Sequence, residues 1–265
     1  MLGKLIKYDF RSCWKKFWPV WAAVFVISVI NGISLNYCEK YHNYNFLPNT
    51  LPKLLLFGVA IAACVIAVLW IYNEFCHGLL GCEGYLKFTL PVKESELIGS
   101  KAIVALIMET ISAVMVVVCV IMMAFIATPE YIIDMFGDIF RFFAKFEDVG
   151  IIIVLFFETI VGFVTTALLM DFHIYTAVSA GHMAKNNRKI VTVIAMVLIF
   201  TLTVFLMLNV VAPLTIALNK NAMTWKEDLI GIMNGGAVII VFELIYTAAM
   251  FLFVQFILKN KLNLE

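Results

Sequence analysis

Three glutamates stand inside stretches of the chain that are otherwise almost wholly apolar: Glu109, Glu158 and Glu243. A carboxylate in such a place can take up a proton, attract a cation or hydrogen-bond between helices. Burying it in ionised form costs at least ~2.5–3.5 kcal/mol, and no lysine or arginine lies within these stretches to offset the cost. Each must therefore be protonated, face water or find polar partners. The nearby candidate partners are Thr110, Ser112, Thr159, Thr165 and Asn234.

Cysteine and histidine could supply a metal site or a nucleophile, but neither pattern is complete. Cys76, His77 and Cys82 lie close together in sequence and offer three ligands, whereas structural zinc needs about four held tetrahedrally. We interpret His173 and His182 as polar surface residues flanking a connector. The chain has no GxxxxGK[ST], GxGxxG, HExxH or GxSxG motif. We therefore expect no metal, no cofactor and no enzymatic activity, including ATP hydrolysis through a P-loop.

The glutamates belong to a set of six long apolar runs that fill most of the 265 residues. Each run can cross a hydrocarbon core of about 30 Å at about 1.5 Å per helical residue. A chain that is 63% hydrophobic and only 14% charged cannot hide six such runs in a soluble core. Since lipid offers no hydrogen bonds to the backbone, the runs should be helices. They are Trp18–Leu35, Leu54–Tyr72, Ala102–Ala127, Val149–Met170, Ile190–Val211 and Leu229–Leu258.

The sequence therefore predicts an all-α, polytopic integral membrane protein with six transmembrane helices and a single transmembrane domain over residues 1–265. Basic residues predict its orientation. The N-terminal segment, the second and fourth connectors and the C-terminal tail hold 13 of the 19 lysines and arginines, and the other connectors hold 6. By the positive-inside rule, both termini and connectors two and four are cytoplasmic.

Three segments outside the spans carry further patterns. Residues 1–17 place apolar and basic residues on opposite faces, which predicts a separate amphipathic elbow helix on the inner leaflet, broken from the first span near Pro19. An ordinary frayed terminus is the alternative. Residues 129–148 predict an external amphipathic helix, either against the outer leaflet or at a pore mouth. The short fifth connector, Ala212–Asp228, could dip back into the bilayer.

Connector two, residues 73–101, is the most distinctive stretch. Gly78, Gly81 and Gly84 should end the second span's helix, and Pro91 biases its predecessor away from helix. Ser95, between two glutamates, can start the extension of the third span. A short aromatic and apolar element is thus presented between two turns, which is typical of a docking surface. The alternative is a linker whose aromatic side chains anchor in lipid headgroups.

This connector resembles that of the six-span permease subunits of ABC-2-type exporters from Gram-positive bacteria. The N-terminal elbow and the pair Ser100 and Lys101 before the third span are similar too. The sharp likeness is an EGYLxFTLPV-like segment. It is formed here by Glu83, Gly84, Tyr85, Leu86, Phe88, Thr89, Leu90, Pro91 and Val92.

The resemblance implies that Glu83 to Pro91 form a coupling element that sits in a groove of a separate ATPase. It also implies two ATPase copies, two permease subunits (identical or paralogous) and a bacterial cell membrane as the location. The predicted function is the transport subunit of an ATP-driven exporter in contact with membrane lipid, with no nucleic-acid partner. Glu109, Glu158 and Glu243 would line its translocation path. The alternative is a secondary transporter that uses these glutamates as a proton relay. A hydrolase or a purely regulatory subunit is supported less.

Overall fold

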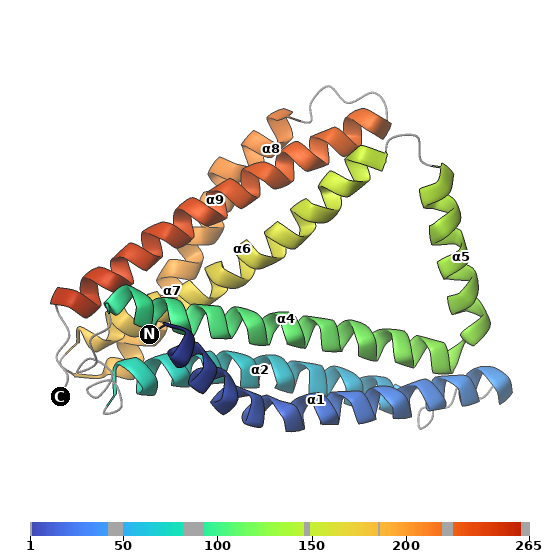
Figure 1. Cartoon of the computed structure of the whole chain (residues 1–265), viewed down its shortest axis with the longest axis horizontal. Helices are drawn as coiled ribbons and strands as arrows, with labels where there is room; N and C mark the ends of the chain where they lie inside the picture. The colour runs from blue at the N-terminus through green and yellow to red at the C-terminus, as the bar shows by residue number, and fades with distance from the viewer. Residues whose placement is uncertain are drawn as a thin grey trace. The chain divides into compact units, whose positions relative to one another are not determined.

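The computed structural model describes residues 2–41, 50–81, 93–145, 149–184, 186–218 and 225–260. Over these ranges the chain is helical and contains no β-strand. Six helical stretches are long and apolar enough to cross a membrane, which confirms the predicted all-α polytopic fold (Figure 1). They are α1 (Leu2–Tyr41), α2 (Leu51–Leu79), α4 (Glu94–Ala127), α6 (Val149–His182), α9 (Trp225–Asn260) and the continuous stretch of α7 (Arg188–Leu206), η2 (Met207–Val211) and α8 (Ala212–Leu218).

Helix α1 contains the segment that was expected to form a separate elbow helix, and it continues through Pro19 without a break. The amphipathic pattern itself is confirmed, since Cys13 and Phe17 are buried while Arg11 is exposed. Proline removes one backbone hydrogen bond and crowds the preceding turn. Packing compensates here, because the Phe17 ring meets the Trp70 ring of α2 edge-on, with ring centroids 5.2 Å apart. Tertiary contact thus holds the helix together where the sequence alone suggests a break.

The fifth span is longer than the predicted run, because α7 continues through η2 and α8 to Leu218. The widened π-helical turn η2 lies just before Pro213, whose ring would otherwise crowd the carbonyl of Asn209. The Asn209 side chain donates to the Phe205 carbonyl oxygen at 2.8 Å. Of the connector expected at Ala212–Asp228, only residues 219–224 lie outside the described helices, and the described part contains no separate re-entrant helix.

The amphipathic helix predicted for the third connector is confirmed as α5 (Pro129–Lys145). Ile133, Phe136 and Phe140 on its apolar side are exposed. Its polar side carries the exposed ion pair of Arg141 and Asp138 at 3.3 Å. Its placement against the outer leaflet or at a pore mouth stays a prediction.

The chain divides into two compact units. The first, called the polar unit below, comprises residues 1–6, 71–106 and 148–265. The second, called the three-helix unit, comprises residues 7–70 and 107–147. The single transmembrane domain predicted over residues 1–265 stays a prediction.

In the three-helix unit, α1 and α4 run parallel to each other. Trp21 contacts Ser112 and Ser28 contacts Cys119, so the two pairs have the same offset of 91 residues along the chain. A constant offset between paired residues is possible only when the two helices point in the same direction.

In the polar unit, α6 and α9 also run parallel (Figure 1). Thr165 contacts Glu243 with an offset of 78 residues, and Gly162 faces Ile240 with the same offset. The C-terminal half of α6 forms the core of this unit, since every residue from Asp171 to Ser179 is buried. A helical segment buried on all sides must be surrounded by other helices, which places this part of α6 at the centre of the unit.

Candidate functional site

The predicted docking residues of connector two, Glu83 to Pro91, lie outside the described residues. The helices on either side are described. Helix α2 ends at Leu79, and α4 begins at Glu94 with a first turn that contains Glu96, as the sequence predicted. The Lys93 carbonyl oxygen accepts hydrogen bonds from the backbone N–H groups of Glu96 and Leu97 at 2.9 and 3.3 Å. The helix start is therefore built from local bonds immediately after the connector.

A buried ion pair joins the two helices that flank the connector. The Lys101 ammonium of α4 contacts the Glu74 carboxylate of α2, and the lysine side chain is only 3% exposed. Ser100, the other member of the pair noted in the sequence, is buried and donates to the Leu97 carbonyl oxygen at 2.9 Å. Lys101 lies one residue before the apolar run Ala102–Ala127, and α4 begins before this lysine and buries it.

The same end of α2 packs against the central helix α6. The rings of Phe75 and Tyr175 stack with centroids 4.2 Å apart and an interplanar angle of 14°. In the next residue along α2, the Cys76 sulfur lies 3.9 Å from Nε2 of His182. We call these two contacts, together with the Lys101–Glu74 ion pair, the connector base. They tie α2, α4 and α6 together beside the connector.

The connector base does not form a metal site from the residues that the structure describes. Cys76 meets His182 and no third cysteine, histidine or carboxylate within the described ranges joins them. Cys82, which belonged to the sequence cluster, lies outside those ranges.

Glu243 lies at the interface of α9 with α6 and is 4% exposed. Its carboxyl oxygens accept hydrogen bonds from the hydroxyls of Thr165 at 2.5 Å and Thr166 at 2.9 Å. Thr165 is one of the polar partners that the sequence suggested. Two donors on one helix therefore hold a carboxyl from the next helix in a fixed position.

Glu158 lies at the same interface, seven residues before Thr165 and hence about 10 Å along α6. A Cβ atom added at Gly236 of α9 would collide with the Glu158 carboxyl group. Glycine at this position therefore makes room for the acidic side chain. Both carboxyl oxygens of Glu158 are buried and accept no hydrogen bond from the described residues.

Glu109 belongs to α4 within the three-helix unit, so the structure groups it separately from the other two glutamates. One of its carboxyl oxygens, Oε2, is buried and has no hydrogen-bond partner among the described residues. The glutamates are thus two neighbours on α6 and α9 and one member of the other unit.

His173 is a residue whose role the sequence analysis missed. It was expected at the surface, but it is 2% exposed. Its Nδ1 lies 2.6 Å from the Leu169 carbonyl oxygen and its Nε2 lies 2.7 Å from the Thr203 hydroxyl of α7. A carbonyl can only accept, so Nδ1 carries the proton in this bond. The surface expectation is wrong because α6 continues nine residues past His173, to His182, and is enclosed there.

Comparisons of the chain with protein-family models, curated proteins and solved structures found no match. The likeness to exporter permeases therefore depends on the sequence of connector two and the elbow. The structure itself establishes a multi-pass membrane chain built of six long apolar helices.

Proposed function

We propose that this chain is the membrane-spanning permease subunit of an ATP-binding cassette exporter. In this proposal residues 83–91 dock onto a separate ATPase, present in two copies, and a second permease subunit completes the transporter. Both termini are cytoplasmic and the location is a bacterial cell membrane. ATP-driven closure of the partner would move the connector and rock the helices between two packed states.

The observation that carries the proposal is the connector base. A push on a connector moves the helices only if its two ends are firmly attached to them. Glu74 and Lys101 lie at the two ends of the connector and pair with each other, and Phe75 extends the contact to Tyr175 of α6. Displacement of the connector would therefore reach three helices together, which supports its role as a lever.

The helix directions support the cytoplasmic placement of connectors two and four. The C-terminal ends of α2 and α6 meet through Cys76 and His182, and the N-terminal part of α4 meets α2 through Lys101. Connector two and connector four therefore begin beside each other, as expected for connectors on one membrane face. Both are the lysine- and arginine-rich connectors, which the positive-inside rule assigns to the cytoplasm.

Co-purification tests the proposal. The chain is co-expressed with a candidate ABC-type ATPase from the same genome, and the complex is captured through a tag on the ATPase. Leu86→Asp should abolish capture, because a charge would enter an apolar contact, whereas Leu86→Met should retain it. Capture that survives Leu86→Asp, or nucleotide-independent pumping by the chain alone, would remove the proposal.

A secondary transporter is the second candidate, and the α6–α9 interface favours it. Glu158 and Glu243 lie about 10 Å apart along one interface, so a proton would pass between them only along a chain of bridging waters, since this distance exceeds the reach of one hydrogen bond. The isolated chain in vesicles would then transport a solute on a pH gradient. Glu158→Gln and Glu243→Gln should each stop that transport, while neither should change capture by the ATPase.

A further inference from the structure

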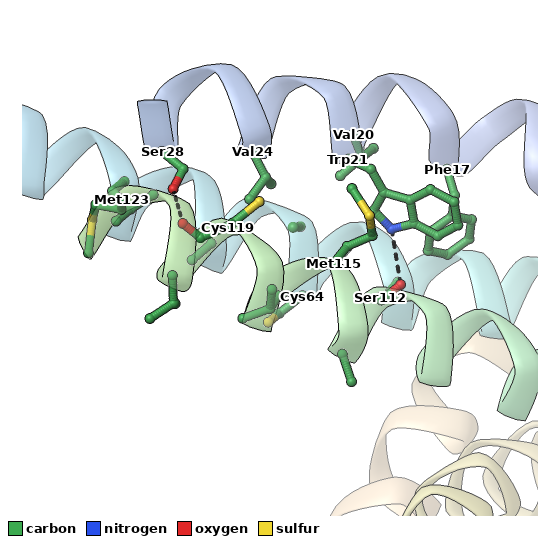
Figure 2. A pocket seen from close by; sticks show the side chains of 17 residues that line it. Phe17, Val20, Trp21, Val24, Ser28, Cys64, Ser112, Met115, Cys119 and Met123 are labelled. Atoms are coloured by element: carbon green, nitrogen blue, oxygen red, sulfur yellow. Dashed lines mark hydrogen bonds between the residues drawn. The ribbon is translucent and has the colours of Figure 1, made fainter. Parts of the chain in front are cut away.

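The three-helix unit holds an apolar cavity of about 410 Å³ between α1, α2 and α4 (Figure 2). Its wall runs from Phe17 to Ser28 on α1, from Leu56 to Ala67 on α2 and from Ser112 to Met123 on α4. Each run covers eleven residue steps, or about 16 Å of helix. The cavity is therefore a long, narrow groove parallel to the helices.

The hydroxyl and indole groups of the wall are already engaged with the protein itself. Trp21 donates from Nε1 to the Ser112 hydroxyl at 3.1 Å, and Ser112 donates to the Met108 carbonyl oxygen at 2.8 Å. Ser28 donates to the Cys119 carbonyl oxygen at 2.6 Å, and Figure 2 shows these side chains turned toward their partners. The described residues of the wall include no charged side chain. An occupant must therefore be uncharged and apolar along its length.

Small side chains and a close helix contact give the groove its shape. Ala60, Ala63 and Ala67 of α2 leave the space open on one side. Beyond the groove, α1 and α4 touch at Gly32, where an added Cβ would lie 2.9 Å from the Met123 carbonyl oxygen. Helices α1 and α4 thus stay in contact along the groove, at Trp21 with Ser112 and at Ser28 with Cys119, and approach each other closely at Gly32.

The groove is about half as long as a bilayer's hydrocarbon core is thick, and it crosses the middle part of α4. Met123 lies four residues from the end of α4, or about 6 Å, and Ser112 lies fifteen residues from it, or about 22 Å. The groove therefore covers about 16 Å of a hydrocarbon core that is about 30 Å thick. The wall is also partly exposed on this unit, at Val116 and Val120 of α4 and at Cys64 of α2, so the groove opens to its surroundings.

We propose that this groove binds one acyl chain of a membrane lipid. The groove lies within three candidate membrane spans, so lipid chains are the medium into which it opens. An unfilled groove would lose dispersion contacts along its wall, and an extended hydrocarbon chain restores them without needing a hydrogen bond. The acyl-chain site involves neither the ATPase nor the cargo, so it can be tested independently of the proposed function.

Photolabelling tests the acyl-chain site. The full chain is placed in lipid nanodiscs that contain a phosphatidylcholine with a diazirine on its acyl chain, and labelled residues are mapped by mass spectrometry. Label should concentrate on the α2 and α4 walls rather than spread over the exposed helix faces. Ala63→Phe places a ring in the groove where the acyl chain would lie, so it should lower wall labelling about tenfold. This loss corresponds to about 1.4 kcal/mol of binding free energy. The neighbouring Ala62→Phe, outside the wall, should leave it unchanged.

A second measurement does not depend on a substitution that fills the groove. Lipids with brominated acyl chains quench tryptophan fluorescence on contact, and the difference between the native chain and Trp21→Phe isolates the signal of Trp21. We expect strong quenching of Trp21, although its side chain is only 6% exposed. Three results would each overturn the proposal. One is the absence of Trp21 quenching, another is uniform labelling of all lipid-facing surfaces, and the third is wall labelling that persists in both Ala63→Phe and Ala67→Phe.

Discussion

Helices α1 and α4 of one unit and α6 and α9 of the other both pack in parallel, yet they use polar side chains differently. Across α1 and α4, Ser28 bonds to a backbone carbonyl and Trp21 bonds to a serine hydroxyl. Across α6 and α9, the carboxyl of Glu243 receives two threonine hydroxyls. The first interface uses neutral hydrogen bonds and leaves an apolar groove. The second brings two acidic side chains together, of which Glu243 is held by hydroxyl donors.

The difference suggests that the two interfaces accommodate different kinds of molecule. Acidic side chains in a membrane are costly, so in the proposed transporter a polar or cationic path would follow the α6–α9 interface. The α1–α4 interface offers nothing to a charged solute. Its groove suits a lipid chain, and of the three glutamates within the apolar runs only Glu109 lies in this unit.

Removing the charge of Lys101 should have the largest effect on stability. Lys101→Met leaves the Glu74 carboxylate without its partner, and breaking a buried pair of this kind costs roughly 3–5 kcal/mol of unfolding free energy. Unfolding in mixed micelles by SDS titration measures the change. Lys93→Met, which removes an exposed charge beside the same helix start, should change stability by less than about 0.5 kcal/mol.

The double variant Glu74→Met with Lys101→Met sharpens this test. Replacing both partners with apolar side chains removes the unpaired charge, so much of the lost stability should return. If Lys101→Met alone unfolds no more easily than the native chain, the connector base is not a structural anchor.

Crowding the close contact between α1 and α4 in the three-helix unit should have the next largest effect on stability. Gly32→Ala places a Cβ 2.9 Å from the Met123 carbonyl oxygen and 3.0 Å from Cβ of Ile126, both of which are held by α4. Overpacking against a backbone atom costs roughly 1–3 kcal/mol. Gly58→Ala on α2, where nothing lies within 4 Å, is the control. It should be neutral or slightly stabilising, because alanine favours helix.

The sequence predicted the elements of this fold better than their contacts. Hydropathy alone indicates six spans, since lipid leaves the backbone no alternative to helix. The amphipathic pattern of residues 129–148 likewise predicted α5. Both signals are local, and a local signal can be read from one segment.

Contacts between distant segments could not be read in this way. Lys101 looked like a connector charge, because its partner Glu74 is 27 residues away and only the packing of α2 against α4 brings them together. His173 looked exposed, because nothing in its own segment shows that other helices enclose α6. The Thr165–Glu243 bond could be anticipated from the sequence, because a buried carboxyl needs a donor and Thr165 was among the candidate donors.

Crowding the acidic interface should cost less than crowding α1 against α4. The Cβ of Gly236→Ala would meet the end of the flexible Glu158 side chain, which can turn aside at a cost of roughly 1 kcal/mol. At Gly235 the nearest atom would be 3.6 Å away, so Gly235→Ala should be tolerated. Adding Glu158→Ala to Gly236→Ala should relieve the collision, and failure to do so would mean that Glu158 does not occupy this space.

The smallest predicted effect is the loss of one hydroxyl at the acidic interface. Thr165→Val keeps the shape of the side chain but removes one of the two donors to Glu243, and such bonds in membranes average about 0.6 kcal/mol. Thr159→Val removes a hydroxyl of the same helix that donates to the Leu155 carbonyl oxygen within its own turn, so it should change stability less. Equal effects of the two variants would show that the Thr165–Glu243 bond adds nothing. The contrast between the two interfaces would then depend on the placement of the carboxyl groups alone, since Thr166 would be enough to hold Glu243.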